Sequence, residues 1–137
     1  MNSIPHITYS FTHSISAQQL WGLFQQTNWA ATRTVADIAG MLKATPICLG
    51  AWHDNQLVGF ARALTDDCYR AIVEDVIVDQ SLRGQGIGGT MMEQILDRLK
   101  HVEEIILFCG EERIPFYTQL GFEQSTYPSV MKRRIRL

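Results

Sequence analysis

The fold is decided by a glycine-rich stretch, Arg83-Gly84-Gln85-Gly86-Ile87-Gly88-Gly89. It follows an apolar run typical of a strand, Val76-Ile77-Val78, and it opens a segment from Ile87 to Lys100 whose periodicity predicts a helix. Glycine lets the backbone pass close to a ligand, because no Cβ stands in the way. The first amides of a helix have no partner within the helix and lie at the positive end of its dipole. The stretch therefore predicts a seat for a phosphate or pyrophosphate, to which Arg83 adds a positive charge.

The same glycines also satisfy a dinucleotide-binding fingerprint, Gly84-x-Gly86-x-x-Gly89, with Glu103 and Glu104 near its acidic position. Three observations count against that fold. The loop from Asp79 to Arg83 is long for a turn that should follow its strand directly. The preceding strands read as hairpin-linked, whereas a dinucleotide fold alternates strands and helices, and the chain is too short for two such halves. A Walker A loop is excluded because no Gly-Lys-Ser/Thr follows.

The rest of the chain predicts a mixture of strands and helices without repeats or linkers. Ile87, Met91, Ile95 and Leu99 recur every four residues and predict the core-facing stripe of a helix. Strands are expected at residues 6–11, 47–52, 57–64, 69–78 and 104–109 (the last one buried), and in a final hairpin from residue 122 onward and over 130–137. Helices are expected from a Ser16 cap through Gln25, from a Thr34 cap to Pro46, over 87–100 and over 115–120.

Composition narrows the class of protein. The chain has 137 residues, of which 46% are hydrophobic and 19% charged, and this suits one folded domain over residues 1–137. A net charge of −2 argues against a nucleic-acid binder, and no run is long enough to span a membrane. Three widely spaced cysteines and the lack of a secretory signal favour the reducing cytoplasm. The four histidines show no metal-ligand spacing, so no metal is expected.

The glycine stretch resembles motif A of the GNAT superfamily of N-acetyltransferases, Gln/Arg-x-x-Gly-x-Gly/Ala, which Arg83, Gly86 and Gly88 match. The order of predicted elements resembles this fold over essentially the whole chain. The resemblance implies an α/β (α+β) fold with a mixed, mostly antiparallel sheet flanked by helices and a β–α crossover at the pyrophosphate turn. It implies acetyl-CoA as cosubstrate. Its expected contacts are Val76, Ile77 and Val78 for the pantetheine, through their backbone, and Arg83, Gly84, Gln85, Gly86, Ile87, Gly88 and Gly89 for the pyrophosphate.

Two adjacent acids, Glu74 and Asp75, stand in the strand that enters the turn. Buried acids are costly unless they are paired or functional. Strand alternation would place them on opposite faces, with Glu74 on the face of Val76 and Val78. Similar enzymes carry their base at this parity, so Glu74 is the expected general base and Asp75 the reserve base or a structural partner. The pair also resembles the Glu-Asp pair of glucosamine-phosphate acetyltransferases. An ion pair of Glu74 with Arg62 or Arg70 is the alternative.

The resemblance also assigns Tyr117, within Tyr117-Thr118-Gln119-Leu120-Gly121-Phe122, as the acid that protonates the CoA thiolate. A tyrosine that only satisfies a buried hydrogen bond is the alternative. Relatives often carry Asn seven residues earlier, where this chain has Gly110, so Arg113 or backbone groups would replace that contact.

The acceptor site is expected between the first two helices, where Trp29 and Arg33 are candidates for binding substrate. The leading hypothesis is N-acetylation of a primary amine of a small molecule by direct attack in a ternary complex. A protein or peptide N-acetyltransferase and a CoA-binding module without catalysis remain open, and a homodimer is common in similar proteins.

Overall fold

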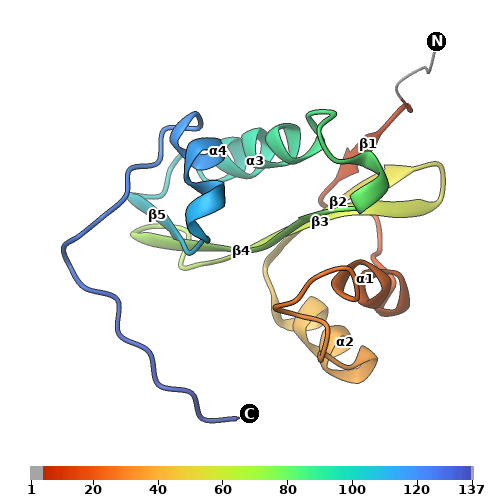
Figure 1. Ribbon diagram of the computed structural model, residues 1–137, viewed down its shortest axis with the longest axis horizontal. Coiled ribbons are helices and arrows are strands. Elements are labelled where there is room, and N and C mark those ends of the chain that lie inside the picture. Colours follow the sequence, from red (N-terminus) through yellow and green to blue (C-terminus); the bar gives the residue numbers. More distant parts are fainter. Residues whose placement is uncertain (1–4, 137) are drawn as a thin grey trace. The chain divides into compact units, whose positions relative to one another are not determined.

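The structure is a computed structural model that describes residues 5–136. The chain falls into two compact units, Met1–Leu107 and Phe108–Leu137. The first unit is built on a five-stranded sheet whose spatial order follows the sequence, and only the β4–β5 pair is parallel (Figure 1). This confirms the predicted mixed, mostly antiparallel sheet. The strands are β1 (Thr8–Ser10), β2 (Ile47–His53), β3 (Gln56–Thr65), β4 (Arg70–Val78) and β5 (Glu104–Leu107).

Helices cover both faces of this sheet. Figure 1 shows α1 (Ala17–Phe24) and α2 (Val35–Ala44) on one side and α3 (Ile87–Arg98) on the other. The predicted caps are confirmed, because the Ser16 side chain accepts a hydrogen bond from the Gln19 amide and the Thr34 side chain accepts one from the Asp37 amide. No helix among residues 5–136 combines the length and the apolar character that crossing a membrane requires.

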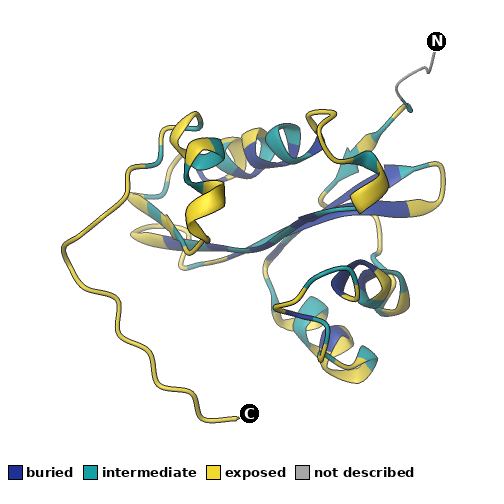
Figure 2. Cartoon of the chain, in the orientation of Figure 1, coloured by how far each residue is buried: buried dark blue, intermediate teal, exposed yellow. Residues whose placement is uncertain are grey.

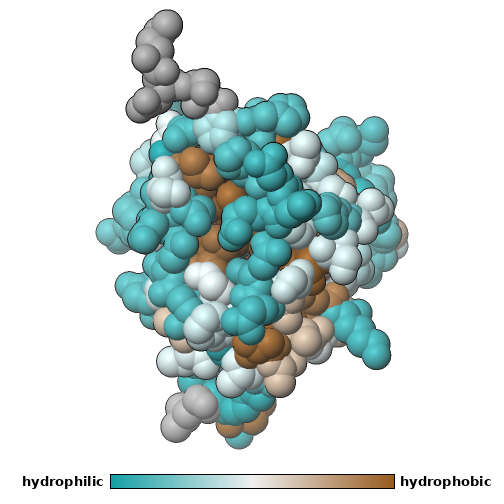
Figure 3. Space-filling view, turned by 90° about the vertical axis from the view of Figure 1, so that its right-hand side faces the viewer, coloured by the Kyte–Doolittle hydropathy of each residue, from teal (hydrophilic) through white to brown (hydrophobic). Residues whose placement is uncertain are grey.

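The core lies in two layers, one on each face of the sheet (Figure 2). The α1–α2 layer packs on the sheet through Leu20, Leu23, Phe24, Ala30, Ile38, Trp52, Leu57, Phe60 and Ile77. In the α3 layer, the predicted stripe of Ile87, Met91, Ile95 and Leu99 is confirmed, since all four are at most 4% exposed. On the face drawn in Figure 3, hydrophobic side chains form narrow strips between hydrophilic ones. Most of the periodic apolar residues of the helices thus pack against the sheet.

The crossover from β4 to β5 sets the start of α3 at the end of β4. A short 3₁₀ turn, η1 (Gln80–Leu82), follows β4, and the Asp79 amide donates to the Val58 carbonyl at 2.8 Å. The glycine stretch then leads into α3, and β5 returns beside β4. This is the predicted strand, turn and helix arrangement.

The fifth strand differs from its prediction. It ends at Leu107 instead of residue 109, and its residues alternate between exposed and half-buried instead of being buried. In the part of the chain that the structure describes, β5 is an edge strand with a ladder partner only on its β4 side, so no second strand covers its other edge.

In the second unit, η2 (Glu111–Arg113) leads into α4 (Ile114–Thr118), which has a proline in its first turn as predicted. The predicted C-terminal hairpin is wrong for the described residues, because no strand forms over residues 123–136. Two features of the sequence explain this result. The three consecutive basic residues Lys132, Arg133 and Arg134 break the apolar–polar alternation, and Pro128 has no amide to donate to a ladder. Leu137 lies outside the described residues.

Candidate active site

The glycine stretch forms an open turn at the start of α3. Gly84 and Gly86 have φ angles of 79° and 85°, a left-handed conformation that favours glycine. Gly86 is the N-cap and offers no side chain, so the first helical bond runs from the Thr90 amide to the Gly86 carbonyl. The amides of Ile87–Gly89 are therefore left without a side-chain cap, and the first turn carries no acidic residue. A Cβ built on Gly86 would meet no atom within 4 Å, which shows that the space beside the turn is open.

Several polar contacts hold this turn in place. The Gln26 side chain accepts from the Gln80 amide at 2.8 Å and donates to the Asp79 carboxylate at 3.3 Å, which ties the end of α1 to η1. Arg83 donates from Nε to the Val78 carbonyl at 3.2 Å, so its guanidinium is anchored at the end of β4. The result is a helix start with uncapped amides and a positive charge fixed beside it, an arrangement that suits an anion.

Strand β4 has a free edge next to this seat. Its ladder with β5 runs from Arg70 to Val73 and stops where β5 ends at Leu107. From Glu74 to Val78, the described residues give β4 ladder pairs with β3 alone. Within residues 5–136 the backbone of Val76–Val78 thus has no ladder partner on that side, which suits the backbone contacts expected of these three residues. A ligand with amide groups could complete that edge as an added strand.

A β-bulge in β4 changes the faces on which the two acids lie. Phe60 pairs with Ile77 and Arg62 pairs with Glu74, so β3 advances two residues while β4 advances three. Paired residues share a face, and Phe60 and Ile77 belong to the α1–α2 core, so Glu74 also faces α1 and α2. The prediction that Glu74 and Asp75 lie on opposite faces is therefore wrong. Asp75 occupies the bulge with a φ of 58°.

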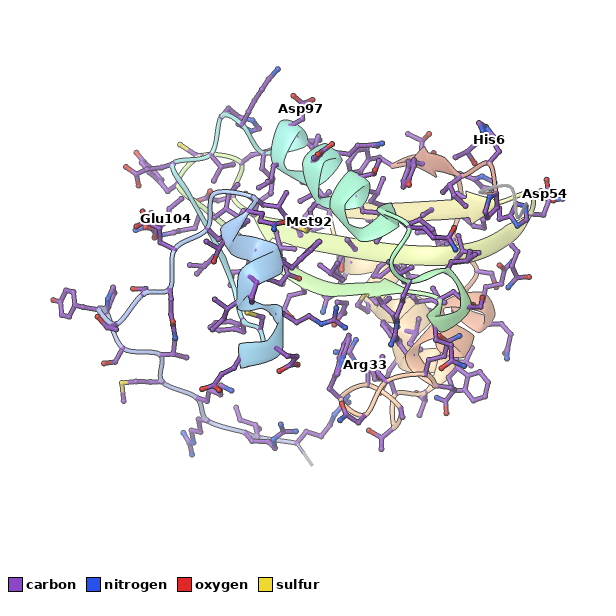
Figure 4. All side chains as sticks on the ribbon, turned by 45° about the horizontal axis from the view of Figure 1, so that its top comes forward. His6, Arg33, Asp54, Met92, Asp97 and Glu104 are labelled. Carbon is purple, nitrogen blue, oxygen red and sulfur yellow. The ribbon has the colours of Figure 1, made fainter. Side chains whose placement is uncertain are left out.

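Asp75 is the centre of a buried ion-pair cluster. Its side chain is 2% exposed, and its Oδ2 accepts from Arg33 Nη1 at 2.8 Å and from Arg62 Nε at 2.7 Å. Arg33 rises toward the sheet from the loop between α1 and α2 (Figure 4). Asp75 therefore ties that loop to β4, which is the behaviour of a structural partner.

Glu74 has a different environment. The side chain is half-buried, and within residues 5–136 its carboxylate makes no ion pair or hydrogen bond. The alternative ion pairs are taken up elsewhere, since Arg62 binds Asp75 and Arg70 binds Glu103 and Glu104. Burial raises the pKa of Glu74, the Asp75 charge raises it further, and Arg62 and Arg33 oppose this rise. A carboxyl with a raised pKa and no structural partner suits a general base.

The structure places both acceptor candidates on the α1–α2 loop. Trp29 is 53% exposed and meets the Phe24 ring edge-on at 6.2 Å. The Arg33 guanidinium lies 4.8 Å from the centre of the Phe24 ring and 5.8 Å from that of Trp29. These contacts bring Trp29, Arg33 and Asp75 together on one face of the sheet.

Sequence reasoning assigned Arg62 no role in binding, yet Arg62 completes this cluster. It lies between Ala61 and Ala63, which are both fully buried, and its side chain is only 13% exposed. A single charged residue inside a buried apolar strand is the signal that could have identified it, because such charges are rare unless they are paired.

In the second unit, the Tyr117 ring packs edge-on against Phe116 at 4.9 Å and Phe122 at 5.9 Å. Its hydroxyl makes no hydrogen bond to any residue in the described part of the chain, so a buried hydrogen bond does not explain it. Burial raises the pKa of Tyr117, the nearby Cys109 raises it further, and Arg113 opposes the rise. The phenol thus stays protonated and keeps a proton to donate.

Metal-ligand geometry is absent from residues 5–136, where no group of three or more His, Cys, Asp or Glu side chains could hold an ion. Asp79 and Arg83 are the charged side chains in the turn itself, and Glu74, Asp75, Arg33 and Arg62 lie on or beside the strand that enters it.

Comparison with known proteins agrees with this geometry. A protein from Gracilaria tenuistipitata var. liui, the uncharacterized N-acetyltransferase ycf52, is 38% identical over 126 residues, which cover 88% of this chain and 69% of that protein. The histone acetyltransferase TAP1 of Glycine max is 28% identical over 135 residues and 88% of this chain, but this chain spans 58% of that protein. Two relatives from Arabidopsis thaliana carry the word chloroplastic in their names.

The fold and the family model give the same assignment. A GNAT-family acetyltransferase from Streptococcus pneumoniae superposes with a TM-score of 0.80 at 26% identity, covering 96% of this chain and 98% of that one. The model of the acetyltransferase (GNAT) family matches residues 10–122, which include the open turn, the free edge of β4 and Tyr117. The chain belongs to the GNAT family of acetyltransferases.

Proposed function

We propose that this protein is an acetyl-CoA-dependent N-acetyltransferase that acts on a primary amine of a small molecule. The observation that carries the proposal is the uncapped start of α3 beside the free edge of β4, with the unpaired Glu74 on the same strand. The first two features fit a ligand that has a pyrophosphate and an amide-bearing arm, which acetyl-CoA has. The third supplies a base for an amine.

The proposed reaction is direct attack in a ternary complex. The amine nitrogen forms a C–N bond to the thioester carbonyl carbon, and the C–S bond breaks. Glu74 takes one proton of the ammonium group, through a water, and Tyr117 gives a proton to the departing CoA thiolate. The second amine proton, which is lost as the amide forms, returns to Tyr117 through solvent. The role of Tyr117 rests on the family resemblance and on its free, protonated hydroxyl.

Replacing Tyr117 by Phe should slow the chemical step and leave the affinity for acetyl-CoA and the melting temperature nearly unchanged. The ring contacts with Phe116 and Phe122 persist, and only the hydroxyl is lost. The effect is expected to be moderate, because a thiol with a pKa of about 8.5 is a fair leaving group without help. Single-turnover kinetics measure the step. Wild-type rates where chemistry is limiting would return Tyr117 to a packing role.

Binding of acetyl-CoA should be weakened about tenfold or more by Gly86→Glu. The new side chain would enter the open space beside the α3 amides, and its carboxylate would repel a phosphate there. Isothermal titration calorimetry measures the affinity. Gly40→Glu is the matched control, because Gly40 in α2 is exposed and a Cβ there also meets nothing within 4 Å.

Two results would contradict the assignment. One is unchanged acetyl-CoA affinity in a folded Gly86→Glu protein, and the other is tighter binding of NAD than of acetyl-CoA. Because Gly86 has a positive φ, circular dichroism must first show that the variant is folded.

A second candidate function is acetylation of a protein or peptide amine, which the name of the Glycine max relative favours. A thiol-release assay with small amines, amino acids, polyamines and peptides separates the two. Release with peptides alone would favour the second candidate, and CoA binding without release on any amine would indicate a binding module.

Two further expectations belong to the proposal. The three cysteines are free, which supports a reducing compartment such as the cytoplasm. The assembly state is proposed to be a homodimer, which analytical ultracentrifugation tests directly.

A further inference from the structure

Two arginines converge on a single carboxylate oxygen next to Glu74. Arg33 Nη1 and Arg62 Nε both donate to Oδ2 of Asp75, at 2.8 and 2.7 Å. One arginine comes from the α1–α2 loop and the other from the middle of β3. Because both contact the same oxygen atom, the two guanidinium groups must lie close together despite their like charges.

Most of the donors of this pair are unused. A guanidinium has five N–H donors, and within residues 5–136 each of these two side chains donates only the bond to Asp75. The rings of Phe24 and Trp29 hold the Arg33 guanidinium without consuming donors. Arg70, on the same strand as Asp75, is different, since it meets Glu103, Glu104 and the Tyr69 carbonyl.

The charges of the cluster balance only while Glu74 is ionised. Two guanidinium groups face one Asp75 carboxylate, and a partly buried cation without a counterion is costly. Glu74 faces the cluster, but it becomes neutral whenever it takes a proton. Cys48 pairs with Arg62 across β2 and β3, and burial raises the pKa of its thiol, which therefore stays neutral. While Glu74 holds a proton, the described neighbours leave one positive charge that an incoming anion can compensate.

We propose that Arg33 and Arg62 form an anion subsite for the acceptor, so that the acceptor is a primary amine that also carries a carboxylate or phosphate group. Guanidinium forks match both anions, and the two arginines are already fixed by Asp75 and the aromatic rings. The subsite lies on the face of the sheet toward which Glu74 projects, so the anionic group would orient the amine toward its base. The inference rests on the proposed function and adds the substrate class to it.

The first test compares amines that differ only in the anion. The probes are phosphoethanolamine against ethanolamine and β-alanine against propylamine, each assayed by thiol release from acetyl-CoA. We expect kcat/KM to be about 10- to 100-fold higher for the anionic member of at least one pair, as charged hydrogen bonds contribute. The preferred pair distinguishes phosphate from carboxylate. Equal values within both pairs would overturn the subsite and leave the acetyltransferase assignment intact.

The second test removes the subsite. Arg62→Met and Arg33→Met should lower the ratio of kcat/KM between the anionic and neutral amines toward one, mainly through KM of the anionic amine. Arg70→Met is the matched control, because Arg70 is an exposed arginine of β4 outside the cluster. The kcat/KM ratio between anionic and neutral amines in this variant should equal that of the wild-type protein. A ratio that survives in folded Arg33→Met and Arg62→Met proteins would contradict the proposal.

A third measurement needs neither a variant nor turnover. Inorganic phosphate and phosphoethanolamine should bind the wild-type complex with CoA in calorimetry, and phosphate should compete with the amine but not with acetyl-CoA. No binding to the CoA complex, or competition only against acetyl-CoA, would overturn the subsite. If CoA binds and no amine is acetylated, the proposed function fails, and this binding experiment still decides the subsite.

Discussion

Replacing Glu74 by Gln should lower turnover about 10²- to 10⁴-fold while the affinity for acetyl-CoA persists. The side chain keeps its size and its half-buried position, and only its ability to accept a proton is lost. The seat for the pyrophosphate lies at the start of α3 and does not involve this side chain. Steady-state kinetics with a reactive amine and calorimetry with acetyl-CoA measure the two quantities separately.

The pH profile identifies the role of Glu74. Burial and the Asp75 charge raise its pKa, so the wild-type rate should fall as pH drops through this raised value and the base becomes protonated. The variant should lack this limb, and its deficit should shrink at high pH, where more of the amine is already neutral. Glu104→Gln is the control, because Glu104 is an exposed acid on the neighbouring strand β5.

The same variant gives an independent readout in stability. A carboxyl whose pKa is raised on folding binds its proton more tightly in the folded state than in the unfolded state. Its stabilising contribution to the free energy of unfolding is therefore fully present below the unfolded pKa and is lost as pH rises through the folded pKa. At neutral pH the folded protein therefore carries a desolvated charge that glutamine lacks. Glu74→Gln should melt at or above the wild-type temperature at pH 7, and this gain should vanish in acid.

One pattern of results would reverse the assignment of the two acids. If Glu74→Gln has wild-type turnover while a folded Asp75→Asn protein is inactive, Asp75 is the base. The geometry argues for Glu74, because the Asp75 carboxylate is already engaged by two guanidinium groups.

The elements of the first unit could be predicted because their signals are local. The four-residue repeat of α3, the Ser16 and Thr34 caps and the glycine turn each depend on neighbours in sequence. The C-terminal hairpin could not be predicted in this way. A hairpin needs alternating apolar and polar residues, so that one face of its strands packs on a core. Residues 123–136 carry consecutive basic residues instead.

The details of the site depended on contacts that alternation cannot foresee. Regular alternation along a strand predicts that Glu74 lies on the same face as Val76. The bulge at Asp75 adds one residue, and Glu74 therefore lies on the α1–α2 face. Two arginines hold the Asp75 side chain at this bulge, and Arg33 lies 42 residues away in the chain. The sequence could name the acids as candidates, but only the register of β3 and β4 separates their environments.

Removing the Asp75 side chain should destabilise the fold by about 3–5 kcal/mol, as expected when one partner of a buried ion pair is lost. Asp75→Ala would leave Arg62, which is 13% exposed, without a counterion, and would release Arg33 from β4. Asp75→Asn should cost less, because asparagine also tolerates a positive φ and keeps an acceptor oxygen. Urea unfolding monitored by tryptophan fluorescence measures both changes.

The matched control is Glu103→Ala. Glu103 pairs with Arg70 at 2.9 Å, only slightly longer than the 2.8 and 2.7 Å contacts of Asp75, but both side chains are more than half exposed. An exposed pair contributes about 0–1 kcal/mol, so the contrast isolates burial from contact distance. If Asp75→Ala were no less stable than Glu103→Ala, the cluster would not fix the α1–α2 loop, and the backbone strain at Asp75 would need another source of compensation. A large loss of stability for Asp75→Ala alone would show that two arginines from other elements hold the left-handed conformation of Asp75 in β4. Asp75 lies next to Glu74, the acid proposed to take the proton.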